Sequence, residues 1–286
     1  MSLRDIKQRI HSVKSTQKIT SAMKLVSAAK LRRTQAAIDC LRPYEEKLSA
    51  ILSSFLGNAT VQSEYNVSRE VKKVVVIPVA SDTTLCGAFN SNVIRLAKEV
   101  VDEYRLQGIA IEVMPVGKKM HESFKKQGID TIDTLMKQAG APLYSEVAVA
   151  AKELMQRYIA GEIDRIELVY THSVSASKQI PQRELFLPID TAMLVSDNVT
   201  HTADYIIEPT KEELLQSLIP KVIQLHLYTV LLDSSVAEHA ARMIAMQIAT
   251  DNADDLIAEL TLEYNKGRQQ AITNELLDIV SGSLPK

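Results

Sequence analysis

The sequence has few of the residues from which disulfide frameworks and metal sites are built. Only two of its 286 residues are cysteine, Cys40 and Cys86. Two cysteines can form neither a disulfide framework nor a four-cysteine zinc site, and so small a number is typical of a reducing compartment. The six histidines form no H-E-x-x-H motif or other metal-ligand spacing. The sequence therefore predicts no metal site.

Long apolar runs and an excess of charge of one sign are also lacking. The longest unbroken apolar run, around Val74 to Pro78, is only a few residues long, whereas crossing a bilayer takes about 20 residues. We therefore expect any association with a membrane to be indirect. The net charge of -2 identifies no partner.

Glycine and proline are scarce at both ends of the chain. Seven of the nine glycines lie between Gly57 and Gly161, and residues 1–56 contain no glycine and a single proline. Because these residues interrupt helices and strands, their distribution predicts three segments. They are an N-terminal coiled-coil helix over residues 1–57, a central α/β domain over 70–190 and a C-terminal coiled-coil helix over 208–286.

The first segment has the spacing of one long helix. Ser2 and Asp5 form a plausible capping pair, and apolar residues then recur every three or four positions from Leu3 to Val13. The pattern predicts a register slip before it resumes. The later apolar positions are Met23, Val26, Ala37, Cys40, Tyr44, Leu48, Ile51 and Phe55. A helix over residues 3–56 would be about 80 Å long.

The last segment predicts a second long helix. Thr210 and Glu213 fit a capping box, a heptad spacing runs unbroken from Leu218 to Ala271, and Pro220 predicts a kink or a restart. A domain of this size would measure about 40 to 45 Å across, too little to enclose helices of 80 Å or more. The two helices are therefore expected to pair as an antiparallel coiled coil.

The middle of the chain alternates between β-branched runs and helical patterns. Strands are predicted over residues 71–78, 109–116, 165–172 and 183–189, and helices over 92–106, 120–127 and 145–160. Such alternation favours right-handed crossovers and a Rossmann-like, mostly parallel sheet flanked by helices. Residues 173–181 are expected to form a loop, and residues 191–209 the return connection.

Charge is distributed unevenly between the two ends. Residues 1–38 hold nine lysines and arginines against one acid, while residues 208–286 hold twelve acids against six lysines and arginines. Three interpretations remain open. The opposite charges help to pair the helices, the basic face meets acidic loops of another protein, or the basic face binds nucleic acid.

The loop over residues 81–90, SDTTLCGAFN, joins the first strand to the next helix, where nucleotide-binding folds hold phosphate. It has neither G-x-G-x-x-G nor G-x-x-x-x-G-K-[ST], which argues against dinucleotide and P-loop sites. Cys86 could be a nucleophile, but a buried packing role is the more common one. Small residues near both termini also predict a slim tip suited to a sleeve formed by other chains.

Three stretches together resemble one known family. They are ITSAMKLVSAAK at 19–30, SDTTLCGAFN at 81–90, and the block ARMIAMQIATDNADDLIAELTLEYNKGRQQAITNELLDIVSG from Ala241. In this order they resemble the gamma subunits of rotary ATP synthases, and the resemblance covers essentially the whole chain. It implies an α/β fold plus a long antiparallel coiled coil of the terminal helices. The family loop usually reads S-D-R-G-L-C-G-x-F-N, so Thr83 and Thr84 depart from it.

The resemblance implies a non-catalytic rotor, without cofactor, in the central stalk. Such a subunit transmits torque between the membrane c-ring and the catalytic alpha/beta hexamer, with the alpha, beta and epsilon subunits and the c-ring as partners. It lies peripherally at the cytoplasmic face of the bacterial membrane and binds no nucleic acid. Two alternatives stay open from the residues alone: a nucleotide-using α/β enzyme with coiled-coil arms, and a nucleic-acid-binding scaffold.

The resemblance also assigns contact residues. The positions matching beta-subunit contacts are Met23, Lys24, Arg242, Arg268, Gln269 and Thr273. Tyr205 and Glu208 match the segment that faces the c-ring and epsilon side. The resemblance implies no catalytic, cofactor-binding or metal-binding residue.

Overall fold

The computed structural model describes residues 2–56, 64–67, 69–175, 177–189 and 210–282. The chain divides into two compact units. The first combines Met1–Ala28 with Arg242–Lys286, and the second is Ala29–Ala241. Both long terminal helices contribute residues to both units.

The two terminal helices form as predicted. The first, α1, spans Leu3–Leu56, and the last, α6, spans Lys211–Gly282. At the start of α1, the Asp5 amide donates to Ser2 Oγ and the Ser2 amide donates to Asp5 Oδ2, each at 3.2 Å. This reciprocal pair satisfies amides that the first helical turn leaves without partners. The hydrogen bonds from Ser2 lower the pKa of Asp5.

At the start of α6, the Glu213 amide donates to Thr210 Oγ1 at 3.3 Å, as the capping box predicts. The helix then continues through Pro220 without a restart. A proline removes one backbone donor, and here it lies near the N-terminus of a helix of 72 residues.

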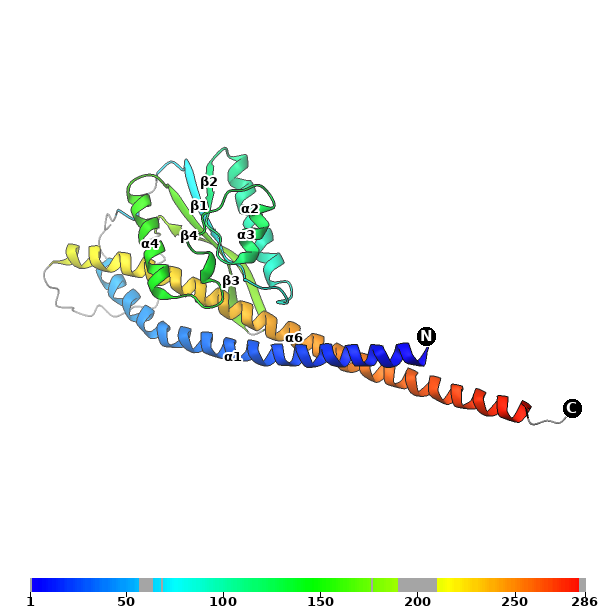
Figure 1. The fold of residues 1–286 in the computed structure, drawn as a ribbon. Helices are drawn as coiled ribbons and strands as arrows, with labels where there is room; N and C mark the ends of the chain where they lie inside the picture. The colour runs from blue at the N-terminus through cyan, green and yellow to red at the C-terminus, as the bar shows by residue number, and fades with distance from the viewer. Residues whose placement is uncertain (1, 57–63, 68, 176, 190–209, 283–286) are drawn as a thin grey trace. The chain divides into compact units, whose positions relative to one another are not determined.

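The second unit is built on a four-stranded sheet. Its strands are β1 (Lys73–Pro78), β2 (Ala110–Val113), β3 (Arg165–Ser175) and β4 (Lys178–Leu187). They lie in the order β2-β1-β3-β4; β1 is parallel to both of its neighbours and β4 is antiparallel to β3. The prediction of a mostly parallel sheet flanked by helices is confirmed (Figure 1).

Successive residues of β1 are buried on opposite faces of the sheet. Val74 and Val76 pack against α2 (Phe89–Leu106) and α3 (Lys118–Lys125). Val75 and Ile77 pack against α4 (Tyr144–Ile159) and the first part of α6. A strand covered on both faces is apolar throughout, which is why residues 74–77 form a continuous apolar run.

The hairpin between β3 and β4 differs from the prediction. Residues 173–181 were expected to form a loop, but β3 extends to Ser175 and β4 begins at Lys178. Ser175 and Lys178 are partners in the ladder. The prediction was wrong because this stretch is polar, and it is polar because the end of the hairpin is largely exposed to solvent. The connection predicted over 191–209 lies outside the described residues.

The apolar character of α6 has a clear cause. By length and composition alone, one helix of the described residues, Glu213–Ile279 within α6, is apolar enough to cross a membrane, with a mean hydropathy of 1.2 in its most apolar stretch. The search for unbroken apolar runs in the sequence did not find this helix, because lysine, histidine and glutamine interrupt its apolar residues. Leu215, Ile219, Ile223 and Leu227 are buried in the core that covers the sheet, so packing accounts for this composition.

Candidate functional site on the paired helices

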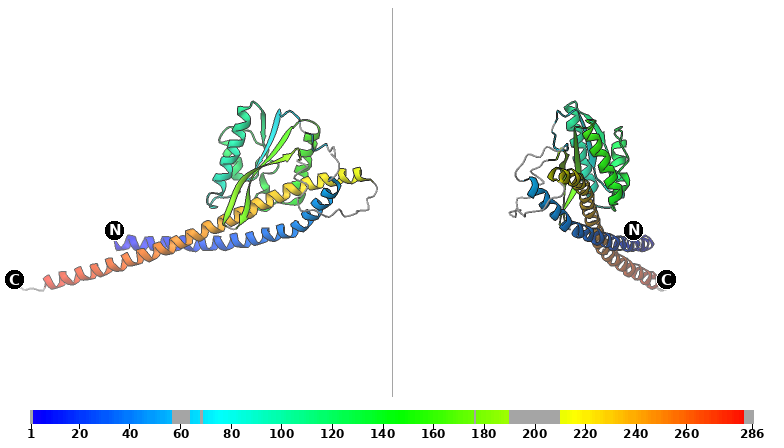
Figure 2. Two further views of the ribbon diagram at one scale, coloured as in Figure 1. Left: turned by 180° about the vertical axis from the view of Figure 1, so that it is seen from behind. Right: turned by 90° about the vertical axis from the view of Figure 1, so that its left-hand side faces the viewer.

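In the first unit, α1 and α6 run antiparallel in one constant register (Figure 2). Four close pairs define it: Leu3 with Gly267, Gln17 with Asp254, Thr20 with Thr250, and Lys24 with Gln247. In every pair the two residue numbers add up to 270 or 271, as expected for antiparallel helices that pair without a slip. The predicted antiparallel coiled coil is confirmed for these segments.

The buried seam of α1 passes through polar residues where the sequence analysis predicted a slip. Thr20, Ser27 and Thr34 are buried at the three- and four-residue spacing that Ile6 begins. On the predicted path Val26, Cys40 and Tyr44 are exposed, whereas Leu48 is buried and also lies on the spacing that Ile6 begins. The slip was therefore wrong, because a search for apolar residues cannot recognise a seam made of hydroxyl side chains.

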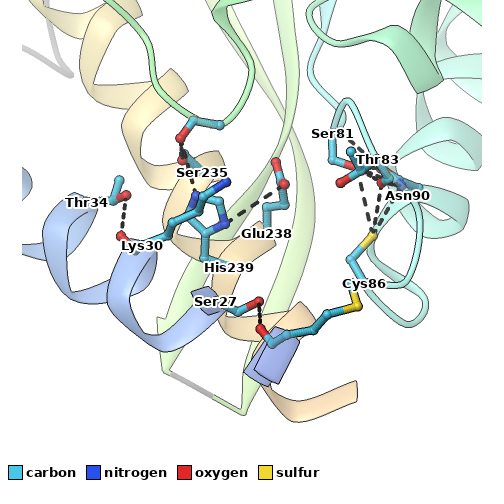
Figure 3. A network of polar contacts seen from close by, with 12 residues as sticks. Ser27, Lys30, Thr34, Ser81, Thr83, Cys86, Asn90, Ser235, Glu238 and His239 are labelled. Atoms are coloured by element: carbon cyan, nitrogen blue, oxygen red, sulfur yellow. Dashed lines mark hydrogen bonds and ion pairs between the residues drawn. The ribbon is translucent and has the colours of Figure 1, made fainter. Parts of the chain in front are cut away.

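These hydroxyl groups can be buried because each has a hydrogen-bond partner on its own helix. Ser27 Oγ donates to the carbonyl of Met23 at 2.8 Å, and Thr34 Oγ1 donates to that of Lys30 at 2.9 Å (Figure 3). A buried polar group is costly only when it lacks a partner. The seam therefore tolerates small polar side chains.

Three polar layers follow one another in the middle of the pair. Gln17 Nε2 donates to Asp254 Oδ1, Thr250 Oγ1 lies next to Thr20 Oγ1, and Lys24 Nζ donates to Gln247 Oε1, each at 2.8 Å. Gln247 also donates through Nε2 to Asp251 Oδ1 at 2.6 Å. We call these three pairs the polar layers.

The predicted contact residues fall into two separate groups. Met23 and Lys24 are half-buried on α1, and Arg242 is buried on α6. Arg268, Gln269 and Thr273 are exposed near the end of α6. From Gln247, the partner of Lys24, to Arg268 is 21 residues, about 30 Å along a helix. The predicted residues therefore cannot form one compact site.

The second group lies on a part of α6 that has no helix beside it. Gly267 lies beside Leu3, the first residue of α1, and every side chain described from Arg268 to Ile279 is exposed. Thr273 Oγ1 donates to the carbonyl of Gln269 at 2.9 Å, a bond within the helix. Figure 2 shows α6 continuing past the N-terminus of α1. We call residues 268–282 the unpaired segment.

The unpaired segment carries large apolar side chains that the sequence analysis did not select. Ile272, Leu276, Leu277 and Ile279 are all exposed, Leu276 to 58%. Ile272, Leu276 and Ile279 are four and three residues apart, so they share one face of the helix. This face is offset by one residue from the heptad of α6, whose continuation beyond Ala271 falls on the polar residues Asn274, Asp278 and Ser281, so extending the heptad would not have found it.

The basic residues of α1 also face solvent. Arg4, Lys7, Arg9, Lys14 and Lys18 are exposed. Within the residues that the structure describes, none of these five forms an ion pair with an acid of α6. The interpretation that opposite charges pair the two helices is therefore not supported in this unit, where the pairing uses the seam and the polar layers.

Tyr205 and Glu208, predicted to face the c-ring and epsilon side, lie outside the described residues.

In the second unit, the loop after β1 is closed by its own side chains (Figure 3). Ser81 Oγ donates to the Thr83 carbonyl at 2.6 Å, and the Ser81 amide donates to Asn90 Oδ1 at 3.1 Å. Asn90 Nδ2 lies within hydrogen-bond distance of Ser81 Oγ, the Thr83 carbonyl and Cys86 Sγ. These groups satisfy one another, which leaves Ser81 and Asn90 poorly placed to bind phosphate.

Cys86 has a packing role, as expected. Its side chain is buried and belongs to a small apolar cluster with Phe89 of α2 and Ala237 of α6. Leu85 beside it has a φ of 66° and is exposed. A positive φ is unfavourable for a side chain such as leucine, so the hydrogen bonds of the loop must hold this turn.

Two histidine–carboxylate pairs join α6 to the β3–β4 hairpin. His226 Nε2 lies 2.7 Å from Glu184 Oε1, and His172 Nδ1 lies 2.6 Å from Asp233 Oδ2. Burial alone would raise the pKa of Glu184, but hydrogen bonds from His226 and Tyr170 outweigh it, so the pKa of this carboxyl is lowered. No group of histidine, cysteine or acidic side chains in the described ranges could hold a metal ion. Each histidine links α6 to the hairpin through its carboxylate partner.

Sequence comparisons agree on one family. A model of the ATP synthase family matches residues 2–284. The chain is 49% identical over 295 residues to an ATP synthase gamma chain of Bacteroides thetaiotaomicron, covering 99% of each chain. It is also 46% identical over 284 residues to an ATP synthase gamma chain of Flavobacterium psychrophilum, covering 99% of this chain and 98% of the relative.

Solved structures show the same fold at low sequence identity. A chain of the Euglena gracilis mitochondrial ATP synthase (OSCP/F1/c-ring, rotational state 3) matches with a TM-score of 0.64 and 22% identity, covering 98% of this chain and 93% of that one. A chain from the central stalk and c-ring structure of the Tetrahymena thermophila mitochondrial ATP synthase matches with a TM-score of 0.57 and 23% identity, covering 81% and 99%.

Proposed function

This chain belongs to the ATP synthase family, and on that premise we propose that it is the gamma subunit, the rotor of the central stalk. As such it transmits torque between the membrane c-ring and the catalytic alpha/beta hexamer. Residues 1–57 and 208–286 act together as the shaft, and residues 70–190 act as the foot. Through its complex the chain would lie peripherally at the cytoplasmic face of the bacterial membrane.

The observation that carries this proposal is the unpaired segment of α6. An isolated helix of about 15 residues is marginal in water and is stabilised mainly by packing its apolar face. Here Ile272, Leu276 and Ile279 form such a face and are exposed. A contiguous apolar surface of this kind marks a binding site for another protein. A sleeve formed by the alpha and beta subunits would cover it.

An asymmetric shaft can couple rotation to chemistry without a catalytic group of its own. In the first unit one side presents the basic residues of α1, and another presents the acids of α6, such as Asp255 and Glu259. As the shaft turns, each beta subunit would meet these sides in succession. A surface of the shaft that binds the open state of a beta subunit more tightly than the closed state, or the reverse, shifts the balance between the two states. The nucleotide affinity of that beta subunit then changes by the same free energy as the difference in binding.

We assign the contacts in two levels. Met23, Lys24 and Arg242 would contact beta subunits at the lower level, with the exposed lysines of α1 facing acidic loops. Arg268, Gln269 and Thr273 would contact beta loops at the upper level, beside the apolar face of the unpaired segment. The separation of about 30 Å along the helix supports two levels of contact rather than one.

Tyr205 and Glu208 would face the c-ring and the epsilon subunit. This assignment rests on the family motif in which they occur. The closed loop after β1 supports a non-catalytic foot, since Ser81 and Asn90 bond one another rather than presenting their donors to a phosphate.

Reconstitution tests the proposal. The purified chain is mixed with alpha and beta subunits, and ATP hydrolysis is measured for the chain alone, for the alpha/beta mixture, and for the complex after gel filtration. The proposal expects no hydrolysis by the chain alone, and its co-elution with a complex whose hydrolysis depends on it. Micromolar ATP affinity of the free chain in calorimetry would favour the nucleotide-using enzyme. Binding to duplex DNA at physiological salt would favour the scaffold.

A further inference from the structure

We infer that the polar layers fix the register of the α1–α6 pair and thereby set the residue at which the unpaired segment begins. Thr20 and Thr250 form the central layer. The inference concerns the free chain, and it goes beyond the proposed function without depending on it.

The apolar part of the seam does not define a single register. On α1 the seam residues near the N-terminus are Leu3, Ile6, Ile10 and Val13, and on α6 they include Ile257, Leu260 and Tyr264. A heptad pattern is nearly unchanged by a shift of seven residues. In the observed register Ile6 lies at the level of Tyr264; after such a shift it would lie at the level of Ile257, also an apolar residue. Apolar contacts alone would therefore allow either arrangement.

The polar layers distinguish these registers, because only the observed one satisfies all three. A shift of seven residues in either direction separates Thr20 from Thr250 by two helical turns and places it beside Met243 or Ile257. One direction would bring Lys24 level with Asp254 in exchange, but it would still break the Thr20 layer and the Gln17 layer. The observed register is the arrangement in which each donor has its partner.

A shifted register would break the contact between the two threonines of the central layer, although each hydroxyl would keep a partner on its own helix: Thr20 Oγ1 donates to the Gln17 carbonyl at 3.0 Å and Thr250 Oγ1 to the Met246 carbonyl at 2.8 Å. Thr20 and Thr250 are both buried, and their hydroxyl oxygens are 2.8 Å apart. Polar groups in the seam of a coiled coil reduce stability but specify register, since other alignments leave them against apolar side chains. Thr20, Thr250 and their neighbours are therefore positioning residues.

The register has a direct consequence for α6. Because Leu3 is held beside Gly267, Arg268 is the first residue beyond the pair. A shift of seven residues one way would cover two more turns of α6, and a shift the other way would uncover two. The polar layers thus determine which side chains, including Gln269 and Thr273, are presented on the unpaired segment.

Distance measurements on the full chain test the inference. Spin labels are attached at Gln8→Cys on α1 and Asn252→Cys on α6, both exposed, in a Cys40→Ser background. Labelling of buried Cys86 is checked in the same background without the two new cysteines. A shift of seven residues moves the labels past one another by about 10 Å along the helix axis, which pulsed electron paramagnetic resonance resolves.

The test variant replaces the polar layers with apolar side chains: Gln17→Leu, Thr20→Val, Gln247→Met and Thr250→Val. Apolar replacements favour pairing, so helix content by circular dichroism should be retained. We expect one narrow distance peak for the chain with unaltered polar layers. For the variant we expect a second peak at a shifted distance that accounts for at least one tenth of the molecules. A single peak at the unaltered distance in the variant would overturn the inference.

Two matched chains separate register control from general disturbance of the seam. Ile10→Leu with Ile257→Leu changes seam packing without touching a polar layer, and it should keep the single peak. Thr20→Ser with Thr250→Ser keeps both hydroxyls and should also keep it. A shifted population of the same size in either control would count against the polar layers as the cause. Because no partner subunit is present, a negative result here leaves the reconstitution experiment unaffected.

Discussion

Gly267 of α6 lies against Leu3 of α1 so closely that a Cβ atom at position 267 would come within 3.0 Å of Leu3 Cδ2. Alanine in place of a helical glycine stabilises a helix by about 1 kcal/mol. We expect Gly267→Ala to stabilise the chain by less than that, because Leu3 must move. In a Leu3→Ala background the full gain should appear. Urea denaturation followed by circular dichroism measures both, and equal gains would show that the two residues are not coupled.

Gly117 precedes α3 with a φ of 89°, and a Cβ atom there would lie 2.1 Å from the Ala80 carbonyl oxygen. Gly117→Ala should therefore destabilise the second unit by about 3 kcal/mol or more, since it adds a backbone clash to the cost of a positive φ. Gly128 provides the control: its φ is 69° and nothing lies within 4 Å of the added atom. Gly128→Ala should cost only about 1 to 2 kcal/mol, the cost of the left-handed conformation alone. Similar melting temperatures for the two variants would contradict this account.

Glu112 of β2 accepts hydrogen bonds from Arg157 Nη1 and Nη2 at 2.6 and 2.8 Å. These bonds are the main reason that the pKa of Glu112 is lowered, against the opposing effect of burial. A carboxyl whose folded pKa is lowered adds stability that is present above its unfolded pKa and is lost as the pH falls through the folded value. Between about pH 5 and pH 3, the free energy of unfolding should fall less for Glu112→Gln than for the unaltered chain.

A surface acid serves as the control for that experiment. Glu99 forms an exposed pair with Arg95 at 4.0 Å, and such pairs contribute little to stability. Glu99→Gln should leave the acid dependence of unfolding unchanged. If it flattened the curve as much as Glu112→Gln, the Arg157 contact would not be the source of the effect.

Arg268 and Gln269 are exposed on the unpaired segment, so their side chains add little to the fold of the free chain. Arg268→Ala with Gln269→Ala should leave its circular dichroism unchanged and should reduce ATP-driven proton pumping of the reconstituted complex several-fold. Glu263→Ala, an exposed change on the paired part of α6, is the matched control. A loss of helix content equal to the loss of pumping would mean that the two residues serve only the helix.

The elements with strong periodicity could be predicted from the sequence. The presence of α1 and of the central strands β1 and β3 follows from apolar spacing, since their burial demands it. The family motifs located Arg268, Gln269 and Thr273, but only the structure shows that they lie beyond the last residue pair with α1. Their exposure follows from where Leu3 lies on α6, a non-local relationship that no window of the sequence contains.

Two features could not be predicted, because polar residues occupy buried or paired positions that periodicity assigns to apolar residues. Ser27 and Thr34 occupy buried seam positions through hydrogen bonds to their own helix, while Val26 at the apparent apolar position is exposed. The β3–β4 hairpin likewise extends into a polar stretch around Ser175. In both places, hydrogen-bond partners rather than apolar spacing decide burial or pairing.

The end of α1 beside Gly267 marks a change in mechanical stiffness. Two helices packed along a seam resist bending far more than one helix does, because the backbone of each helix lies away from the central axis of the pair and must stretch or compress when the pair bends. Up to Leu3 the pair should behave as a rigid lever, and beyond it the lone helix should flex to follow the walls around it. The same boundary that exposes the apolar face therefore also makes the tip compliant.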